Sequence, residues 1–135
     1  MAGNLASLQD RPRIDRRPNE NGRSRMSSKV TTLLNEQFDR EVLQSKEPVL
    51  VDFFATWCGP CRALAPVLDD LAGDLAGSGR VVKVDVDRAP ELAARYGISS
   101  IPCLVLFQDG REVKRLLGAV SKARIAALFP TARAA

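Results

Sequence analysis

The sequence has no histidine among its 135 residues, and this absence removes several kinds of chemistry. Catalysis by a Ser-His or Cys-His pair is excluded, and so is every zinc site that uses histidine. No apolar run approaches the roughly 18 residues that a membrane-spanning helix needs. Any reaction must therefore use cysteine, carboxylates, lysine or the backbone, and we expect no membrane partner.

Signals for export are also missing. The N-terminus MAGNLASLQDRPR lacks a basic start followed by an apolar stretch, so it does not predict a secretory signal. Mitochondrial transit peptides are rich in Arg and poor in acids, whereas this segment contains Asp10, Asp15 and Glu20. We therefore expect a cytoplasmic chain, in which three cysteines do not suggest a framework of structural disulfides.

The positive charge of the chain is concentrated at its N-terminus. Residues 1–28 carry six Arg and three acidic residues, whereas the remaining residues carry 14 basic and 13 acidic groups. This polar segment shows no apolar periodicity, so we interpret it as a disordered basic extension. It either has no function, for example because Met26 is the true start, or acts as an electrostatic tether. Residues 29–135 are then one nearly neutral domain, for which we expect no nucleic-acid partner.

The body of the chain alternates between strand-like and helix-like segments. Residues 30–34 (VTTLL) are a candidate edge strand. Asn35 can cap the short helix that follows, in which Phe38 and Val42 are spaced for one buried face. Residues 49–55 (VLVDFFA) form a nearly continuous apolar run with β-branched and aromatic residues. Such a run is typical of a buried central strand.

A longer helix is expected next, and the GSG of residues 77–79 ends it. Its apolar residues recur at three- and four-residue spacing, namely Leu64, Val67, Leu68, Leu71 and Leu75. Residues 80–86 (RVVKVDV) predict another strand. A short helix then starts with Pro90 and stops at Gly97, in keeping with the residues that helix ends prefer.

The last third of the chain predicts a hairpin and a closing helix. Residues 103–118 read as two strands around Asp109-Gly110, a strong hairpin signal. Ser121 is a candidate cap for the final helix. The order of elements implies parallel crossovers first and antiparallel pairing later. We therefore expect an α/β fold with a mixed central sheet of about five strands, flanked by about four helices.

Residues 58–61 (CGPC) join the predicted central strand to the long helix. Backbone N–H groups in the first turn of a helix are unpaired, and that end carries partial positive charge. A thiolate at Cys58 is stabilised there, so we expect a lowered pKa and a nucleophilic sulfur at neutral pH. Pro60 fits the start of a helix, because its missing N–H does no harm there. Cys61 lies one turn further along, close enough to attack a mixed disulfide formed at Cys58.

A C-x-x-C pair alone is a weak signal, because zinc ligand pairs and copper carriers use it as well. Closing a zinc site would require a second C-x-x-C or a histidine pair, and only Cys103 remains. We favour a redox dithiol in which Cys58 attacks and Cys61 resolves. A metal site and a pair of inert buried thiols are the alternatives.

The segment VDFFATWCGPC, residues 51–61, resembles the active-site signature of the thioredoxin family, including Trp57 before the first cysteine. The segment RVVKVDVDRAPELAARYGISSIPCLVLFQDGREVKRLLGAVSKARI, residues 80–125, is similar to the rest of that family in order and spacing. The resemblance covers about Val30 to Phe129, and it implies the thioredoxin fold for residues 29–135.

The resemblance implies roles for two charged residues. Asp52 matches the family's buried aspartate, whose pKa is raised and which can exchange a proton with Cys61. Burying an unpaired carboxylate is costly, so the alternative is an Asp52 that faces solvent at a strand edge. Lys83 matches the family lysine near that aspartate and can tune Asp52. Alternatively, its side chain extends to the surface.

The resemblance also implies a docking surface for substrate. Pro102, in SSIPC, matches the family's cis-proline, which places the Ile101 backbone where it can pair with an extended substrate chain. Gly118 matches a glycine of the same surface. The alternatives are a trans proline before a strand and a strand-ending turn, respectively. The other members of this surface are Trp57, Gly59 and Pro60. The Gly59-Pro60 pair between the cysteines, which tunes redox behaviour, resembles that of reducing family members.

Three further positions bear on the resemblance. Phe54 stands where many family members have a second tryptophan, which mainly affects packing. Cys103 follows the predicted cis-proline, where threonine is usual. It is either a small buried residue or lies close enough to the dithiol to be oxidised or to alter its poise. Pro66 matches a helix-kinking proline and is structural.

The resemblance implies a thiol–disulfide oxidoreductase that reduces protein disulfides through Cys58 and Cys61. The family implies recharging by a separate, NADPH-dependent thioredoxin reductase that contains a flavin. We expect no cofactor bound to this chain, which has no G-x-G-x-x-G motif or phosphate loop, and we expect a monomer. The main alternative is a thioredoxin-fold binding or assembly subunit that works without turnover. A secreted or membrane-tethered reductant is a third hypothesis, which the missing signals disfavour.

Overall fold

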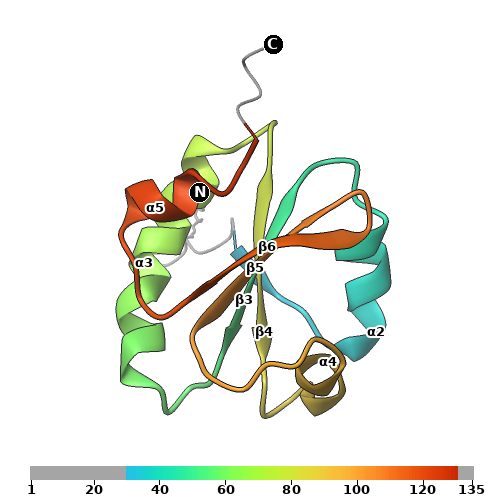
Figure 1. The fold of residues 1–135 in the computed structure, drawn as a ribbon, viewed down its shortest axis with the longest axis vertical. Helices are drawn as coiled ribbons and strands as arrows, with labels where there is room; N and C mark the ends of the chain where they lie inside the picture. Colours follow the sequence, from blue (N-terminus) through green and yellow to red (C-terminus); the bar gives the residue numbers. More distant parts are fainter. Residues whose placement is uncertain (1–29, 131–135) are drawn as a thin grey trace, which may run out of the picture.

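A computed structural model describes residues 30–130 as a mixed five-stranded sheet with helices on both faces (Figure 1). The strands are β2 (Val30–Thr32), β3 (Val49–Phe54), β4 (Arg80–Asp85), β5 (Cys103–Gln108) and β6 (Arg111–Leu117). The helices are α2 (Asn35–Phe38), which continues into the π-helix η2 (Asp39–Leu43), then α3 (Gly59–Asp74), α4 (Pro90–Arg95) and α5 (Lys122–Ala126). The predicted fold class and the predicted order of elements are confirmed.

The pairing of the strands places the loops that follow β3, β4 and β6 and the loop that precedes β5 at one edge of the sheet. The strand order is β2-β4-β3-β5-β6, with β4 parallel to both β2 and β3. β5 runs antiparallel to β3 and to β6. The carboxyl ends of β3 and β4 therefore meet the start of β5 and the end of β6 at the same edge. The CGPC segment follows β3 at this edge.

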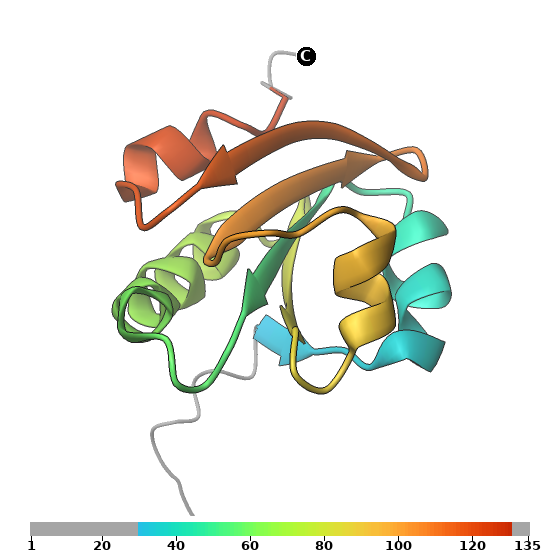
Figure 2. The same cartoon turned by 60° about the horizontal axis from the view of Figure 1, so that its bottom comes forward.

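The sheet separates two apolar cores, because successive side chains of a strand point to opposite faces. Figure 2 shows α3 on one side of the sheet and α2 and α4 on the other. Val51 and Phe53 of β3 pack in the core on the α2 and α4 side. Leu50 packs with Leu64 and Leu68 of α3 in the other core. Asp52 follows the same alternation, so it faces the side of the sheet that α3 covers.

Three of the predicted turns and caps are observed. Asp109 and Gly110 both have positive φ, at 54° and 81°, and they connect β5 to β6 as a hairpin. Ser121 caps α5, because its side-chain oxygen accepts a hydrogen bond from the Arg124 backbone N–H at 3.2 Å. Gly97 ends the short helix α4 with a φ of 63°.

The predicted cap of the first helix is wrong. Asn35 is the first residue of α2, and Leu34 occupies the cap position. The Leu34 backbone N–H donates instead to the Gln37 side-chain oxygen at 2.8 Å. The Asn35 side chain donates to Glu91 at 2.6 Å. The Gln37 side chain therefore satisfies the backbone N–H of the cap residue, as the third helical residue does in a capping box.

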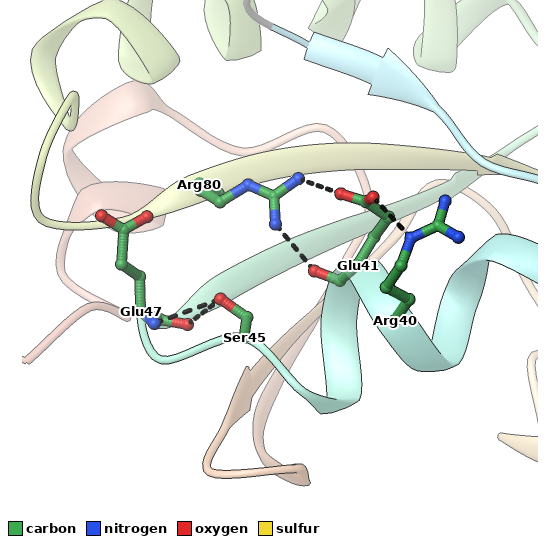
Figure 3. Close-up of polar contacts among 5 residues, drawn as sticks. All are labelled: Arg40, Glu41, Ser45, Glu47 and Arg80. Carbon is green, nitrogen blue, oxygen red and sulfur yellow. Dashed lines mark hydrogen bonds and ion pairs between the residues drawn. The ribbon is translucent and has the colours of Figure 1, made fainter.

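A polar clamp fastens η2 to the end of the sheet opposite the CGPC segment (Figure 3). The Arg80 guanidinium donates to the Glu41 carboxylate at 2.9 Å and to the Glu41 backbone carbonyl at 2.7 Å. Arg40 donates to the same carboxylate at 3.3 Å. These hydrogen bonds lower the pKa of Glu41, and the bond from Arg80 has the largest effect. The clamp ties the start of β4 to η2, and η2 lies before the central strand β3.

The predicted disordered extension, residues 1–28, and the candidate start Met26 lie outside the described residues. Within residues 30–130, no helix is long and apolar enough to cross a membrane.

Candidate active site

Cys58 and Cys61 form a disulfide at the joint between β3 and α3, with their Cα atoms 5.3 Å apart. Cys58 occupies the cap position of α3, and its sulfur accepts a hydrogen bond from the Cys61 backbone N–H at 3.2 Å. The exposed fraction is 5% for Cys58 and 2% for Cys61. A donor and a helix N-terminus therefore face the sulfur of Cys58, which is also the more accessible of the two.

Asp52 lies in the middle of β3 and is fully buried. Neither carboxylate oxygen has a hydrogen-bond partner among the described residues. Burial raises the pKa of Asp52 from 3.8 to about 7, and the positive charge of Lys83 opposes this rise. The alternative of an Asp52 that faces solvent is excluded by this burial.

Lys83 is the register partner of Asp52 across the parallel strands β3 and β4. Its side chain is half-buried, and its Nζ lies 4.4 Å from the centroid of the Phe54 ring. Lys83 also lines a hollow that reaches Cys61. The sequence left open whether Lys83 lies near Asp52 or extends to the surface. Lys83 lies beside Asp52 and also borders this hollow, so both descriptions apply.

The predicted docking residues gather at the same edge of the sheet. The Ile101–Pro102 peptide bond is cis, as predicted. Ile101 packs against the cluster that contains Cys58 and Cys61. The Gly118 backbone N–H donates to the Pro102 carbonyl at 2.9 Å, and Gly118 has a φ of 86°. The chain therefore brings the end of β6 beside the cis-proline.

Trp57 is the most exposed large apolar side chain described, at 68%. Its indole N–H donates to the Asp87 carboxylate at 2.8 Å. Asp87 is not among the site residues predicted from the sequence. The signal was present, because Asp87 follows the predicted strand of residues 80–86. Parallel strands bring their carboxyl ends to one edge, so Asp87 had to lie near the segment that follows β3.

Arg62 is a second residue of the site that was not predicted from the sequence. It follows Cys61 in the first turn of α3, and its guanidinium donates to the Thr56 backbone carbonyl at 2.9 Å. This hydrogen bond ties the helix to the loop that precedes Cys58. No sequence signal marked Arg62, since an exposed arginine on a helix usually has no specific contact.

Two hollows border the dithiol. One has a volume of about 180 Å³ and is lined by Trp57, Val86, Ile98, Ser99, Ser100 and Ile101. The other has a volume of about 250 Å³ and is lined by Phe54, Ala55, Thr56, Cys61, Arg62, Ala65 and Lys83. They share no lining residue, so the dithiol has two distinct neighbouring recesses.

Cys103 is the one cysteine outside the disulfide, and it is 1% exposed. It packs in the core on the α2 and α4 side of the sheet, opposite Phe53 of β3. Burial raises the pKa of its thiol. This position favours a small buried residue over a reactive thiol. Within residues 30–130, no group of three or more Cys, Asp or Glu residues is placed to hold a metal ion.

Comparisons with known proteins agree with this geometry. The thioredoxin family model matches residues 29–130. Thioredoxin 1 of Synechococcus elongatus is 48% identical over 99 residues, which cover 73% of this chain and 92% of that protein. Thioredoxin of Mycobacterium tuberculosis is 48% identical over 98 residues, covering 73% and 84%. A bifunctional thioredoxin reductase/thioredoxin of Mycobacterium leprae is 50% identical over 88 residues, covering 65% and 19%. The chain therefore belongs to the thioredoxin family, and it is a thiol–disulfide oxidoreductase.

Proposed function

We propose that Cys58 is the attacking thiol and Cys61 the resolving thiol in the reduction of client protein disulfides. The thiolate of Cys58 attacks one client sulfur and displaces the other as a thiolate, which leaves a mixed disulfide. Cys61 then attacks the Cys58 sulfur and expels the client's remaining thiolate. Two electrons pass to the client, and the Cys58–Cys61 disulfide forms. The observation that supports this order most is the helix N–H that Cys61 donates to the Cys58 sulfur.

We propose that Asp52 takes the proton that Cys61 loses when it resolves the mixed disulfide. A group with a pKa of about 7 can accept and return a proton at neutral pH. Both of its oxygens lack partners within the described part of the chain, so they are free to accept. Lys83, its neighbour on β4, lowers the pKa of Asp52 and keeps the ionised form accessible.

We propose that the client chain docks on the surface formed by Trp57, Gly59, Pro60, Ile101, Pro102 and Gly118. Trp57 supplies exposed apolar area, and the cis bond before Pro102 leaves the Ile101 backbone beside the disulfide cluster. An extended client segment can pair with that backbone as an added strand does. The Gly59-Pro60 pair stiffens the turn between the cysteines and so affects the redox poise.

The partners that we propose are a thioredoxin reductase and disulfide-containing proteins of the cytoplasm. The name of the Mycobacterium leprae relative joins a reductase and a thioredoxin in one protein, which supports this pairing. Electrons would come from NADPH through that separate reductase. The chain itself would bind no cofactor and act as a monomer, with residues 1–28 outside its folded domain.

A coupled assay with a thioredoxin reductase, NADPH and a disulfide protein tests the proposal. We expect NADPH oxidation with the native chain and none with Cys58→Ser. We expect Cys61→Ser to accumulate a mixed disulfide through residue 58, visible by mass spectrometry. A Cys58→Ser protein that captured the client equally well through Cys61 would contradict the assigned order. A binding or assembly role without turnover would instead leave the biological effect intact in the double Cys58→Ser, Cys61→Ser protein.

A further inference from the structure

The hollow on the Cys61 side of the dithiol has an unusual combination of walls. We call it the Cys61 pocket, and its lining residues are Phe54, Ala55, Thr56, Cys61, Arg62, Ala65 and Lys83. Most of this lining is apolar, and the only charged residues in it are Arg62 and Lys83. No carboxylate is among the lining residues. The pocket therefore presents apolar walls together with two positive charges.

The two cations have no carboxylate partner within the described part of the chain. Arg62 donates to the Thr56 carbonyl, which carries no net charge. Lys83 lies over the Phe54 ring. The register partner of Lys83 is the buried Asp52, which is partly protonated at neutral pH because its pKa is about 7. The positive potential of the pocket is therefore left for a partner to neutralise.

The other side of the dithiol carries the opposite charge. Asp87 lies beside Trp57, and its carboxylate accepts the indole N–H. The nearby Asp85 carboxylate accepts the Asp87 backbone N–H at 2.9 Å. A client chain that crosses the dithiol therefore meets the exposed Asp87 carboxylate on the Trp57 side and two cations on the Cys61 side. This asymmetry favours a client whose acidic residue lies toward Cys61.

The pocket is close enough to take a side chain of a client that is bound to Cys58. Cys61 lines the pocket, and its Cα lies 5.3 Å from that of Cys58. An extended chain advances about 3.3 Å per residue. A residue one or two positions from the client cysteine can therefore reach the mouth of the pocket while that cysteine reacts.

We propose that the Cys61 pocket is a specificity subsite for an acidic side chain of the client, one or two residues from the attacked cysteine. The carboxylate pairs with Arg62 and Lys83, and the stem of the side chain contacts Phe54 and Ala65. This inference rests on the proposed function, because it requires a client disulfide that Cys58 attacks.

Disulfide peptides that differ only in one side chain test the subsite. Each peptide carries an intramolecular disulfide and has Glu or its uncharged counterpart Gln beside one cysteine. The chain is reduced chemically, mixed with each peptide, quenched with acid and analysed by chromatography. The rate with dithiothreitol corrects for the intrinsic reactivity of each disulfide. We expect the native chain to reduce the Glu peptide about two- to five-fold faster than the Gln peptide at low salt. This preference should shrink as salt screens the charges.

Two pairs of variants link the preference to the pocket. Arg62→Gln removes a lining charge, and Arg111→Gln removes an exposed charge at the hairpin end of β6. Ala65→Leu fills the pocket, and Ala63→Leu makes the same change at an exposed position of α3 outside the lining. We expect Arg62→Gln and Ala65→Leu to bring the Glu-to-Gln rate ratio toward one. Arg111→Gln and Ala63→Leu should leave the ratio unchanged.

The rate with the Gln peptide distinguishes a failure of the subsite from a failure of the proposed function. The control variants Arg111→Gln and Ala63→Leu should keep that rate. For Arg62→Gln and Ala65→Leu the readout is the Glu-to-Gln rate ratio, and reduction of the Gln peptide shows that these variants are folded and reactive. A native chain that reduces both peptides equally would overturn the subsite and leave the proposed function standing. A preference for the Glu peptide that persists in both Arg62→Gln and Ala65→Leu would likewise overturn the subsite and leave the proposed function standing. A native chain that reduces neither peptide would contradict the proposed function itself.

Discussion

At the scale of single residues, the site depends on two groups in unusual surroundings. Cys58 is placed where a helix begins, so an N–H of the first turn reaches its sulfur. Asp52 is placed where water cannot reach it, so its charged form is disfavoured. The first environment stabilises a negative charge and the second resists one. Burial raises the pKa of Asp52 to about 7, and we expect the helix N-terminus to stabilise the thiolate of Cys58 once the disulfide is reduced.

The burial of Asp52 predicts how stability depends on pH in the oxidised protein. The unfolded chain loses the Asp52 proton near pH 3.8, whereas the folded chain keeps it until about pH 7. Between these values the folded state binds more protons, so the free energy of unfolding falls as pH rises and then levels off above about 7. The pKa shift corresponds to at most roughly 4 kcal/mol.

Asp52→Asn should therefore raise the free energy of unfolding at pH 8 and flatten its decline between about pH 4 and pH 7. Urea unfolding of the oxidised protein across this range measures both effects. Asp109→Asn, in the exposed hairpin turn, is the matched control and should leave the pH profile unchanged. An Asp52→Asn profile that parallels the native one would show that the carboxyl is not destabilised by burial.

At the scale of helices and strands, the close approach of Phe129 to Gly79 fixes the turn between α3 and β4. Gly79 is buried, and a Cβ atom there would lie 2.9 Å from the Phe129 ring and 3.5 Å from the Pro48 carbonyl. Phe129 packs in the core shared with α3, so it cannot move freely. Gly73, by contrast, is an exposed residue within α3.

The same substitution should act in opposite directions at these two glycines. Gly79→Ala should lower the free energy of unfolding by about 1–3 kcal/mol, because the Cβ forces the Phe129 ring to shift. Gly73→Ala should raise it by about 0.5–1 kcal/mol, because alanine is the better helix former. Urea denaturation of both variants measures these changes. A neutral Gly79→Ala would mean that Phe129 is loosely held.

The elements also show what local sequence can and cannot predict. Within residues 30–130, apolar periodicity and turn residues predicted the strands and helices that the structure shows. The hairpin turn at Asp109-Gly110 and the cap at Ser121 could be predicted because they act through contacts with their immediate neighbours. The predicted cap at Asn35 is wrong because the helix begins one residue earlier than expected, with Leu34 at the cap position and its N–H bonded to the Gln37 side chain. The contacts of Asp87 and Arg62 are tertiary, and only the parallel pairing of β3 and β4 could have indicated the first.

At the scale of the whole molecule, the residues of the site lie at one end of the sheet, and the polar clamp lies at the other end. The dithiol, the cis-proline and both hollows lie at the carboxyl ends of β3 and β4, whereas the Arg80–Glu41 clamp lies at the opposite end. All of the site residues named above lie within residues 30–130. The disulfide pair could be predicted from the sequence because the signature of residues 51–61 is contiguous. The pocket beside Cys61 could not, because it arises only where three segments meet.

Removal of residues 1–28 should leave client reduction unchanged, because every group of the proposed site lies outside that segment. The assay compares kcat/KM of the full chain with that of a chain starting at residue 29, at low and at physiological salt. Thermal unfolding of both proteins is the control for folding. A several-fold loss of kcat/KM at both salt concentrations would show that the extension takes part in the reaction.

The most direct test of the account is the pH dependence of alkylation of the reduced protein, followed separately at each cysteine by mass spectrometry. We expect Cys58 to react first, with a midpoint below the value of about 8.5 for a free thiol. Cys61 should react more slowly, and the buried Cys103 should react only after denaturation. A Cys58 midpoint at or above that of a free thiol, or faster alkylation of Cys61, would contradict the assignment of Cys58 as the nucleophile.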